Sequence, residues 1–224
     1  MDKIFSVAID GPSGAGKSTI AKAVAEELNI DYIDTGAMYR AVAYKMGLEN
    51  VQPTDFIKVK RVLDETKIDF AKGDVILDGE IVNSKIRTPE MSQKASEFSG
   101  LGDVREKLVE LQRKMAETKS VIMDGRDIGT NVLMEAEYKF FMTASPSERA
   151  QRRYEELLEK GETVTFDQVL EDIVARDHND TMRKLNPLKK ADDALEVDTT
   201  GMSIEEVTAF IIREVRNHVN SKTI

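Results

Sequence analysis

The sequence predicts an α/β fold in which a mostly parallel sheet carries helices on both faces. Short apolar segments alternate with longer segments whose apolar residues recur with a helical period, the pattern typical of such folds. Of the 224 residues 41% are hydrophobic, which is enough for a sizeable core. We therefore expect a five-stranded sheet, with strands over residues 4–9, 30–33, 120–123, 138–144 and 195–197.

The first expected strand runs directly into a glycine-rich segment over residues 11–19. The segment contains Gly11-x-x-x-x-Gly16-Lys17-Ser18, and residues with a helical apolar period follow at once. Such a loop directs backbone N–H groups at phosphate oxygens, its lysine reaches the β- and γ-phosphates, and its hydroxyl binds Mg²⁺. The sequence thus predicts a nucleotide-binding loop, formed by Gly11, Pro12, Ser13, Gly14, Ala15, Gly16, Lys17, Ser18 and Thr19.

Helices are predicted by apolar stripes and by capping sequences. Ser145, Thr165 and Ser203 each stand three positions before Glu or Gln, which is the signature of a capped helix start. Two segments place apolar residues on one helical face. They are Val104, Leu108, Leu111 and Met115, and, nearer the C-terminus, Val207, Ile211, Val215 and Val219.

One segment, over about residues 68–83, interrupts the alternation. Asp78-Gly79 stands between the apolar runs 75–77 and 80–82, and a third run covers 68–70. Asp-Gly between apolar runs is a strong hairpin signal. We expect a small antiparallel insert, which is either a wall or flap over a substrate or a hairpin without a direct role.

Composition excludes several classes of function. The chain has no cysteine and two isolated histidines, so a metal ion must be held by oxygen atoms. The net charge of −9 disfavours nonspecific attraction to nucleic acid polymers or anionic membranes, so small phosphate-containing partners are favoured. No apolar run is long enough for a signal peptide or membrane span. We expect a soluble cytoplasmic protein that acts as a monomer.

Charged residues follow the second and third expected strands. Asp34-Thr35-Gly36-Ala37-Met38-Tyr39-Arg40 comes after the second strand, and Arg40 could bind a second phosphate there. The third strand ends in Met123-Asp124-Gly125-Arg126-Asp127, which brings carboxylates that suit Mg²⁺ and a guanidinium that suits phosphate. The alternative is a turn in which the aspartates and the arginine pair with each other.

A late charged segment is open to two interpretations. Arg176, Asp180 and Arg183 lie on one face of a helix predicted over 166–184. This face is either the wall of a cleft or a solvated surface with internal ion pairs. The same two alternatives, a phosphoryl-transfer site or pairing with neighbouring glutamates, hold for Arg149, Arg152 and Arg153.

Four motifs in this order closely resemble those of the bacterial cytidylate kinases, which are phosphate-loop nucleoside monophosphate kinases. They are Gly-Pro-Ser-Gly-Ala-Gly-Lys-Ser, Asp-Thr-Gly-Ala-Met-Tyr-Arg, Asp-Gly-Arg-Asp-Ile-Gly-Thr and Arg-Asp-x-x-Asp-x-x-Arg, and the resemblance spans nearly the whole chain. It implies a three-layer phosphate-loop kinase fold as one domain over 1–224. It also implies a substrate-side insert at about 66–95 and a short lid at about 150–186.

The resemblance further implies transfer of the γ-phosphoryl group of ATP to CMP or dCMP in the presence of Mg²⁺. Cytosine has acceptors at O2 and N3 and a donor amine at N4, which Arg105, Ser96 and Asp127 can match. For the acceptor, the resemblance implies that the base is surrounded by Thr35, Ser96, Arg105 and Asp127, the sugar hydroxyls are held by Arg176 and Asp180, and the monophosphate is held by Arg40, Arg126 and Arg183. For the donor, it implies that ATP is bound by the loop 11–19 and Arg153, that Mg²⁺ is held by Ser18 and Asp124, and that the turn over 198–203 flanks adenine. The implied catalytic residues are Lys17, Arg126, Asp127 and Arg183.

Other functions compete with this one. A kinase of the same fold could phosphorylate UMP, AMP or shikimate instead. A GTP-driven regulatory protein is disfavoured because the chain contains no Asn-Lys-x-Asp sequence for guanine. A nucleotide-binding protein without turnover is the third alternative, and the test that separates it from a kinase is whether ADP release depends on an added monophosphate.

Overall fold

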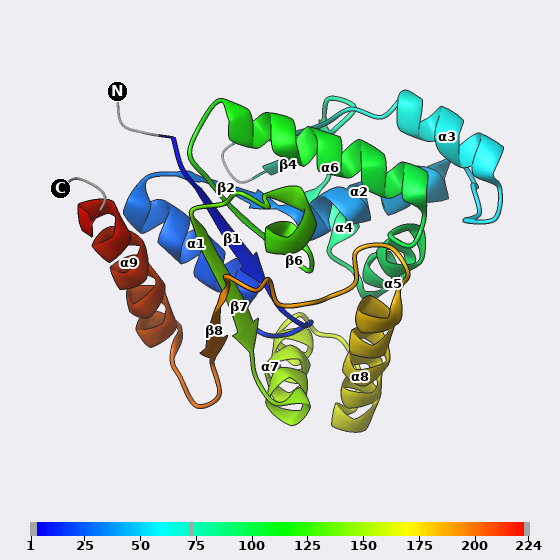
Figure 1. Cartoon of the computed structure of the whole chain (residues 1–224). Helices are drawn as coiled ribbons and strands as arrows, with labels where there is room; N and C mark the ends of the chain where they lie inside the picture. Colours follow the sequence, from blue (N-terminus) through cyan, green and yellow to red (C-terminus); the bar gives the residue numbers. More distant parts are fainter. Residues whose placement is uncertain (1–3, 72–73, 222–224) are drawn as a thin grey trace. The chain divides into compact units, whose positions relative to one another are not determined.

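The computed structural model describes residues 4–71 and 74–221, and the chain forms two compact units. The first unit comprises residues 1–32 and 119–224, and the second unit comprises residues 33–118. Figure 1 labels most of their helices and strands. Among the described residues, no helix is both long and apolar enough to cross a membrane.

The main sheet has five strands, as predicted, and their order is β2-β6-β1-β7-β8. The pairs β1–β6, β1–β7 and β7–β8 are parallel. The strand β1 is central and has later strands on both sides, so its carboxyl end is a topological switch point, where such sheets bind ligands. The strands are β1 (Ser6–Asp10), β2 (Asp31–Asp34), β6 (Val121–Gly125), β7 (Tyr138–Thr143) and β8 (Leu195–Asp198).

Among its described residues, the first unit also contains four α-helices and one π-helical turn. Helices α1 (Lys17–Leu28) and α9 (Ile204–Ser221) pack together, and their apolar faces share a core with the sheet. Of the predicted α9 stripe, Val207, Ile211 and Val215 are buried in this core, whereas the side chain of Val219 lies outside the described residues. The arrowheads of β1 and β7 point toward the end of the unit that carries α7 (Pro146–Glu159) and α8 (Phe166–Met182) (Figure 1).

The predicted caps form, with one difference at the end of α8. The side chain of Ser145 accepts a hydrogen bond from the third residue of α7, and Thr165 and Gln168 form a complete capping box on α8. Ser203 and Glu206 make the same reciprocal pair at α9. Helix α8 ends at Met182 rather than at residue 184, because Arg183 has an extended backbone (φ −62°, ψ 141°). The prediction that Arg183 is helical is therefore wrong, although its side chain still joins that of Asp180.

The second unit is built around helix α2, which packs against α3, α4, α5 and α6. Met38 and Met46 of α2 are fully buried, as are Val104 and Leu108 of the predicted α6 stripe. Leu111 and Met115 of that stripe are half-buried. The helices are α2 (Thr35–Leu48), α3 (Phe56–Asp64), α4 (Asn83–Ile86), α5 (Pro89–Phe98) and α6 (Gly102–Glu117).

The predicted hairpin forms a three-stranded antiparallel sheet in the second unit, in the order β3-β4-β5. Asp78 and Gly79 adopt φ values of 52° and 91°, the left-handed conformation that a two-residue hairpin turn requires. The Asp78 carboxylate pairs at 2.7 Å with the ammonium of Lys45 on α2, which ties the turn to the helix. The strands are β3 (Ile68–Ala71), β4 (Asp74–Leu77) and β5 (Glu80–Ile81).

Candidate active site

The phosphate loop connects β1 to α1 at the switch point of the sheet. A Cβ atom on Gly11 would lie 2.1 Å from the carbonyl oxygen of Met142, so only glycine fits against β7 there. Gly16 has a φ of 81°, and no side chain caps the N-terminus of α1. The first N–H groups of α1 and the positive end of its dipole are therefore directed at the loop, as in phosphate-binding helices.

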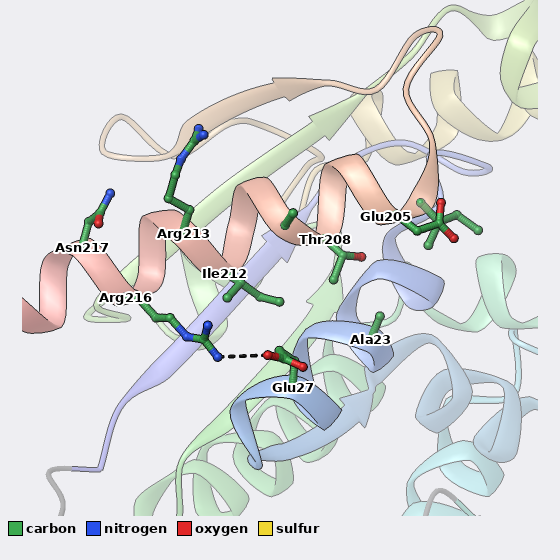
Figure 2. A pocket seen from close by; sticks show the side chains of 10 residues that line it. Ala23, Glu27, Glu205, Thr208, Ile212, Arg213, Arg216 and Asn217 are labelled. Atoms are coloured by element: carbon green, nitrogen blue, oxygen red, sulfur yellow. Dashed lines mark hydrogen bonds and ion pairs between the residues drawn. The ribbon is translucent and has the colours of Figure 1, made fainter.

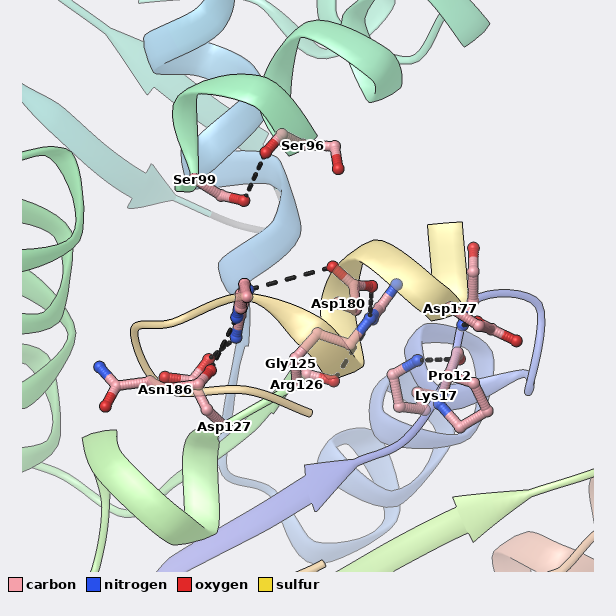
Figure 3. A network of polar contacts seen from close by, with 12 residues as sticks. Pro12, Lys17, Ser96, Ser99, Gly125, Arg126, Asp127, Asp177, Asp180 and Asn186 are labelled. Atoms are coloured by element: carbon pink, nitrogen blue, oxygen red, sulfur yellow. Dashed lines mark hydrogen bonds and ion pairs between the residues drawn. The ribbon is translucent and has the colours of Figure 1, made fainter. Parts of the chain in front are cut away.

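Lys17 is buried in the loop, with 5% of its surface exposed, and its ammonium donates to the carbonyl of Pro12 at 2.7 Å (Figure 3). Burial and the nearby charge of Arg126 lower the pKa of Lys17 to about 7, and Asp124 opposes this shift. A dianionic phosphate beside Lys17 would supply the negative charge that favours the protonated form. The electrostatics of the loop therefore suit an anion.

Ser18 and Asp124 lie together, as a magnesium site requires. The hydroxyl of Ser18 donates to one carboxylate oxygen of Asp124 at 2.9 Å, and the phenol of Tyr32 donates to the other at 2.7 Å. The described residues contain no cluster of three or more His, Cys, Asp or Glu side chains that could hold a metal alone. Two hard oxygen ligands fit Mg²⁺, which keeps several waters and takes its remaining ligands from nucleotide phosphates.

Arg126 and Arg183 each pair with a carboxylate in a network centred on α8, drawn in Figure 3. The guanidinium of Arg126 donates to Asp180 at 2.7 Å, and that of Arg183 donates to Asp127 at 2.9 Å. Burial alone would raise the pKa of Asp180, but the charge and hydrogen bond of Arg126 outweigh it and lower that pKa. Burial alone would lower the pKa of Arg126, but the charge and hydrogen bond of Asp180 outweigh it and raise that pKa.

Asp10 holds the turn that carries Asp127. Its two carboxylate oxygens accept hydrogen bonds at 2.8 Å from the backbone N–H groups of Ile128 and Gly129, the first residues of the π-helical turn η1 (Ile128–Val132). Burial raises the pKa of Asp10 to about 6, and its two backbone hydrogen bonds oppose the shift. The sequence analysis did not assign Asp10 a role, although an ionisable residue at the end of an apolar strand is a signal for one.

The arginines of α7 do not behave alike. Arg149 is buried and contacts Ser13 of the phosphate loop, whereas Arg152 donates to the side chain and carbonyl of Thr199 in the turn after β8. Arg153, predicted to bind ATP, pairs at 2.7 Å with Glu156 on the same helix.

The predicted site residues of the second unit lie on α2, α5 and α6. Thr35 begins α2, and Arg40 pairs at 3.2 Å with Asp34, the residue that caps this helix. The carbonyl of Ser96 accepts a hydrogen bond from the hydroxyl of Ser99 (Figure 3). Arg105 is buried, with its guanidinium 5.8 Å from the centre of the Tyr39 ring. Sequence reasoning missed this aromatic partner.

The structure thus brings together most of the site residues predicted in the first unit. Asp10 and Tyr32 contact this group and were not predicted as site residues. Arg149 and Asp177 contact Ser13 of the phosphate loop, and no sequence pattern indicated these two contacts, because they depend on which helix faces meet the loop. The predicted residues that lie together are Lys17, Ser18, Asp124, Arg126, Asp127, Arg176, Asp180 and Arg183.

A separate groove of about 700 Å³ lies between α1 and α9 (Figure 2). Its rim carries an ion pair of 3.1 Å between Glu27 and Arg216, both of which are exposed. Thr208 and Ile212 also line it, and none of its lining residues is a predicted site residue.

The parallel sheet, with a phosphate loop at its switch point, defines the phosphate-loop kinase fold. A shikimate kinase from Acinetobacter baumannii, solved in complex with shikimate, shares this fold with a TM-score of 0.50 and 13% identity, over 97% of this chain and 96% of that one. An uncharacterized protein from Eubacterium ventriosum aligns with a TM-score of 0.55 and 16% identity, over 96% of this chain and 99% of that one.

Sequence comparison identifies the family within this fold. The family model described as cytidylate kinase matches residues 7–217. A cytidylate kinase from Clostridium perfringens is 52% identical over 211 residues, which is 94% of this chain and 97% of that protein. One from Clostridioides difficile is 49% identical over 209 residues, 93% of this chain and 97% of that protein. The chain belongs to the cytidylate kinase family.

Proposed function

We propose that this protein transfers the γ-phosphoryl group of MgATP to CMP or dCMP, giving ADP and CDP or dCDP. The observation that carries the proposal is a group of cations at the carboxyl edge of the sheet. The positive charges of Arg126 and Arg176 lie close enough to Lys17, at the phosphate loop, to lower its pKa. Membership of the cytidylate kinase family supports the choice of acceptor.

The acceptor is already an anion, so the reaction needs no general base. Catalysis then comes from aligning two nucleotides and from neutralising the charge on the transferred group. Lys17 stabilises the charge on the β- and γ-phosphates, and Arg126 and Arg183 hold the monophosphate together with Arg40. The network of Figure 3 supports these roles, because Arg126 and Arg183 are each already oriented by a carboxylate.

Ser18 and Asp124 would hold Mg²⁺, which neutralises phosphate charge when it is bound. The chain's own contribution is orientation, because Ser18 and Tyr32 fix both oxygens of the Asp124 carboxylate. In the donor site we also assign contacts to the loop 11–19, to Arg153 and to the turn over 198–203.

For the acceptor, Arg105 donates to cytosine O2 and N3, while Ser96 and Asp127 accept from the N4 amine. Thr35 contacts the base, and Arg176 and Asp180 contact the sugar hydroxyls. Uracil presents a carbonyl where cytosine presents its amine, so with UMP Asp127 would face an acceptor instead of a donor. We further propose that the protein acts as a monomer on free nucleotides.

The test is a coupled assay of ADP release with CMP, dCMP, UMP, AMP, GMP and shikimate as separate acceptors. We expect release to depend on the acceptor and to be fastest with CMP or dCMP. Faster turnover with UMP, AMP or shikimate would reassign the acceptor. ATP consumption at one rate with and without any acceptor would overturn the proposal.

A further inference from the structure

Arg149 of α7 holds three parts of the first unit together, and the proposed reaction does not use it. Its side chain is 4% exposed. The guanidinium donates to the carbonyl of Ala144 at 2.9 Å and to the carbonyl of Ser13 at 2.8 Å, and it pairs with the Asp177 carboxylate at 2.7 Å. One side chain therefore connects the end of β7, the phosphate loop and helix α8.

Asp177 of α8 also contacts the phosphate loop. One of its carboxylate oxygens pairs with the Arg149 guanidinium, and the other accepts a hydrogen bond from the backbone N–H of Ser13 at 3.3 Å. Both backbone polar groups of Ser13 are thus held by one ion pair. Ser13 lies between Pro12 and Gly14 in a segment outside any helix or strand, so no helix or sheet supplies these hydrogen bonds, and the Asp177 and Arg149 side chains do.

Packing around the next residue shows how close this contact is. Gly14 has a φ of 75°, and a Cβ atom added to it would lie 3.0 Å from the Arg149 carbonyl oxygen and 3.4 Å from a methyl of Ile173. Ile173 belongs to the core that α7 and α8 share, made of Ala150, Leu157, Val169 and Ile173. The phosphate loop is therefore seated directly on the packed pair α7 and α8.

We propose that Asp177, acting through Arg149 and Ser13, is a positioning residue for the donor nucleotide, because it fixes the shape of the phosphate loop before ATP binds. A loop that is already in its binding conformation loses less conformational freedom when the nucleotide arrives. The inference rests on the proposed donor site, but it does not depend on which acceptor the enzyme uses.

Electrostatics and positioning predict opposite effects of removing this carboxylate. Asp177 contributes to the negative field that raises the pKa of Arg126, so its charge lies close to the phosphate-binding cations. If Asp177 acted only as a charge, its neutralisation would strengthen the binding of an anionic nucleotide. If it positions the loop, neutralisation weakens that binding.

The experiment compares Asp177→Asn with the unchanged protein and with Asp172→Asn, a control at an exposed position on the same helix. MgADP and CMP binding are measured by calorimetry in the full chain, and the melting temperature is measured alongside. We expect Asp177→Asn to weaken MgADP binding about tenfold, as for a lost preorganising contact. CMP affinity changes little, the melting temperature falls because Arg149 is left buried without its carboxylate, and Asp172→Asn matches the unchanged protein.

Hydrogen exchange and a second variant distinguish a local change in the phosphate loop from a general loss of folding in Asp177→Asn. The amide of Ser13 exchanges faster in Asp177→Asn than in the control, because its acceptor is weakened. Arg149→Lys keeps the charge but loses the three-way contact, and we expect it to weaken MgADP binding as well.

Unchanged or tighter MgADP binding in Asp177→Asn would overturn the inference. So would a parallel loss of MgADP affinity, CMP affinity and melting temperature, which indicates a purely structural role. If the unchanged protein binds MgADP but not CMP, the proposed acceptor fails and the inference can still be judged.

Discussion

The phosphate loop and the network around α8 contribute to the same site but are specified in different ways. The loop takes its shape from adjacent residues, since Gly11 fits closely against β7 and Gly16 has a left-handed backbone. The α8 network, by which we mean Asp177, Asp180 and Arg183 with their partners Arg149, Arg126 and Asp127, pairs residues that are distant in the chain. A local motif can specify an anion site by itself, whereas the network requires the packed fold.

The two regions also differ in charge balance. In the α8 network each cation has a carboxylate partner, and the pKa of Asp180 is held low, mainly by Arg126 against the effect of burial. In the loop the pKa of Lys17 falls to about 7 because burial and Arg126 disfavour its charge. The loop therefore gains most from an incoming phosphate, and the network serves to orient groups that are already neutralised in pairs.

The largest expected effect comes from the loop itself. Lys17→Ala should lower kcat by about 100-fold or more, because it removes a cation aimed at charge that develops during transfer. Steady-state kinetics with saturating MgATP and CMP measure it, and Lys60→Ala, at an exposed position on α3, is the control. An unchanged kcat would mean that the loop does not act in the transfer step.

Asp10 links the loop-bearing strand to the turn that carries Asp127, and its titration should appear in the stability. Its pKa rises from 3.8 to about 6 on folding, chiefly through burial. A raised carboxyl pKa stabilises the fold fully below 3.8, and this contribution is lost as the pH rises through 6. Since one pKa unit corresponds to about 1.4 kcal/mol, the total is roughly 3 kcal/mol.

Urea unfolding of the unchanged protein and of Asp10→Asn between pH 5 and pH 7 checks this. As the pH rises, the unfolding free energy of the unchanged protein should fall relative to that of Asp10→Asn, with roughly half of the total change in this range. Because other groups titrate in both proteins, the difference isolates Asp10. A difference that does not vary with pH would contradict the raised pKa.

A double-mutant cycle probes the α8 network. Arg126→Ala and Asp180→Asn should each destabilise the fold, while the double variant loses less than their sum, with a coupling energy of about 1–3 kcal/mol. Glu27 and Arg216 form the control pair, because their 3.1 Å contact joins α1 and α9 at an exposed position. There we expect less than about 0.5 kcal/mol. Equal coupling in the two cycles would show that the network adds no more than a surface ion pair.

The same difference explains what the sequence could predict. The strands, the hairpin at Asp78-Gly79 and the phosphate loop follow from local patterns, and all of them form. The end of α8 did not follow, because no glycine or proline marks the change to extended backbone at Arg183. The contacts of Arg149 and Asp177 with Ser13 could not be predicted either, since they depend on how α7 and α8 pack against the loop.

Tyr32 gives the smallest effect and tests whether orientation matters beyond the motif. Its hydroxyl donates to Asp124 at 2.7 Å, and its ring lies 5.8 Å from the ammonium of Lys22. Tyr32→Phe keeps the ring and removes the donor, so Asp124 loses the hydrogen bond from the phenol. We expect the Mg²⁺ concentration for half-maximal activity to rise about 3- to 10-fold, within the range for groups that orient metal ligands. Calorimetry of ADP binding with and without Mg²⁺ should show a smaller gain from the metal in this variant, and Tyr154→Phe on α7 is the control. If Mg²⁺ dependence is the same in all three proteins, the Tyr32 hydrogen bond does not help to orient Asp124 for the metal.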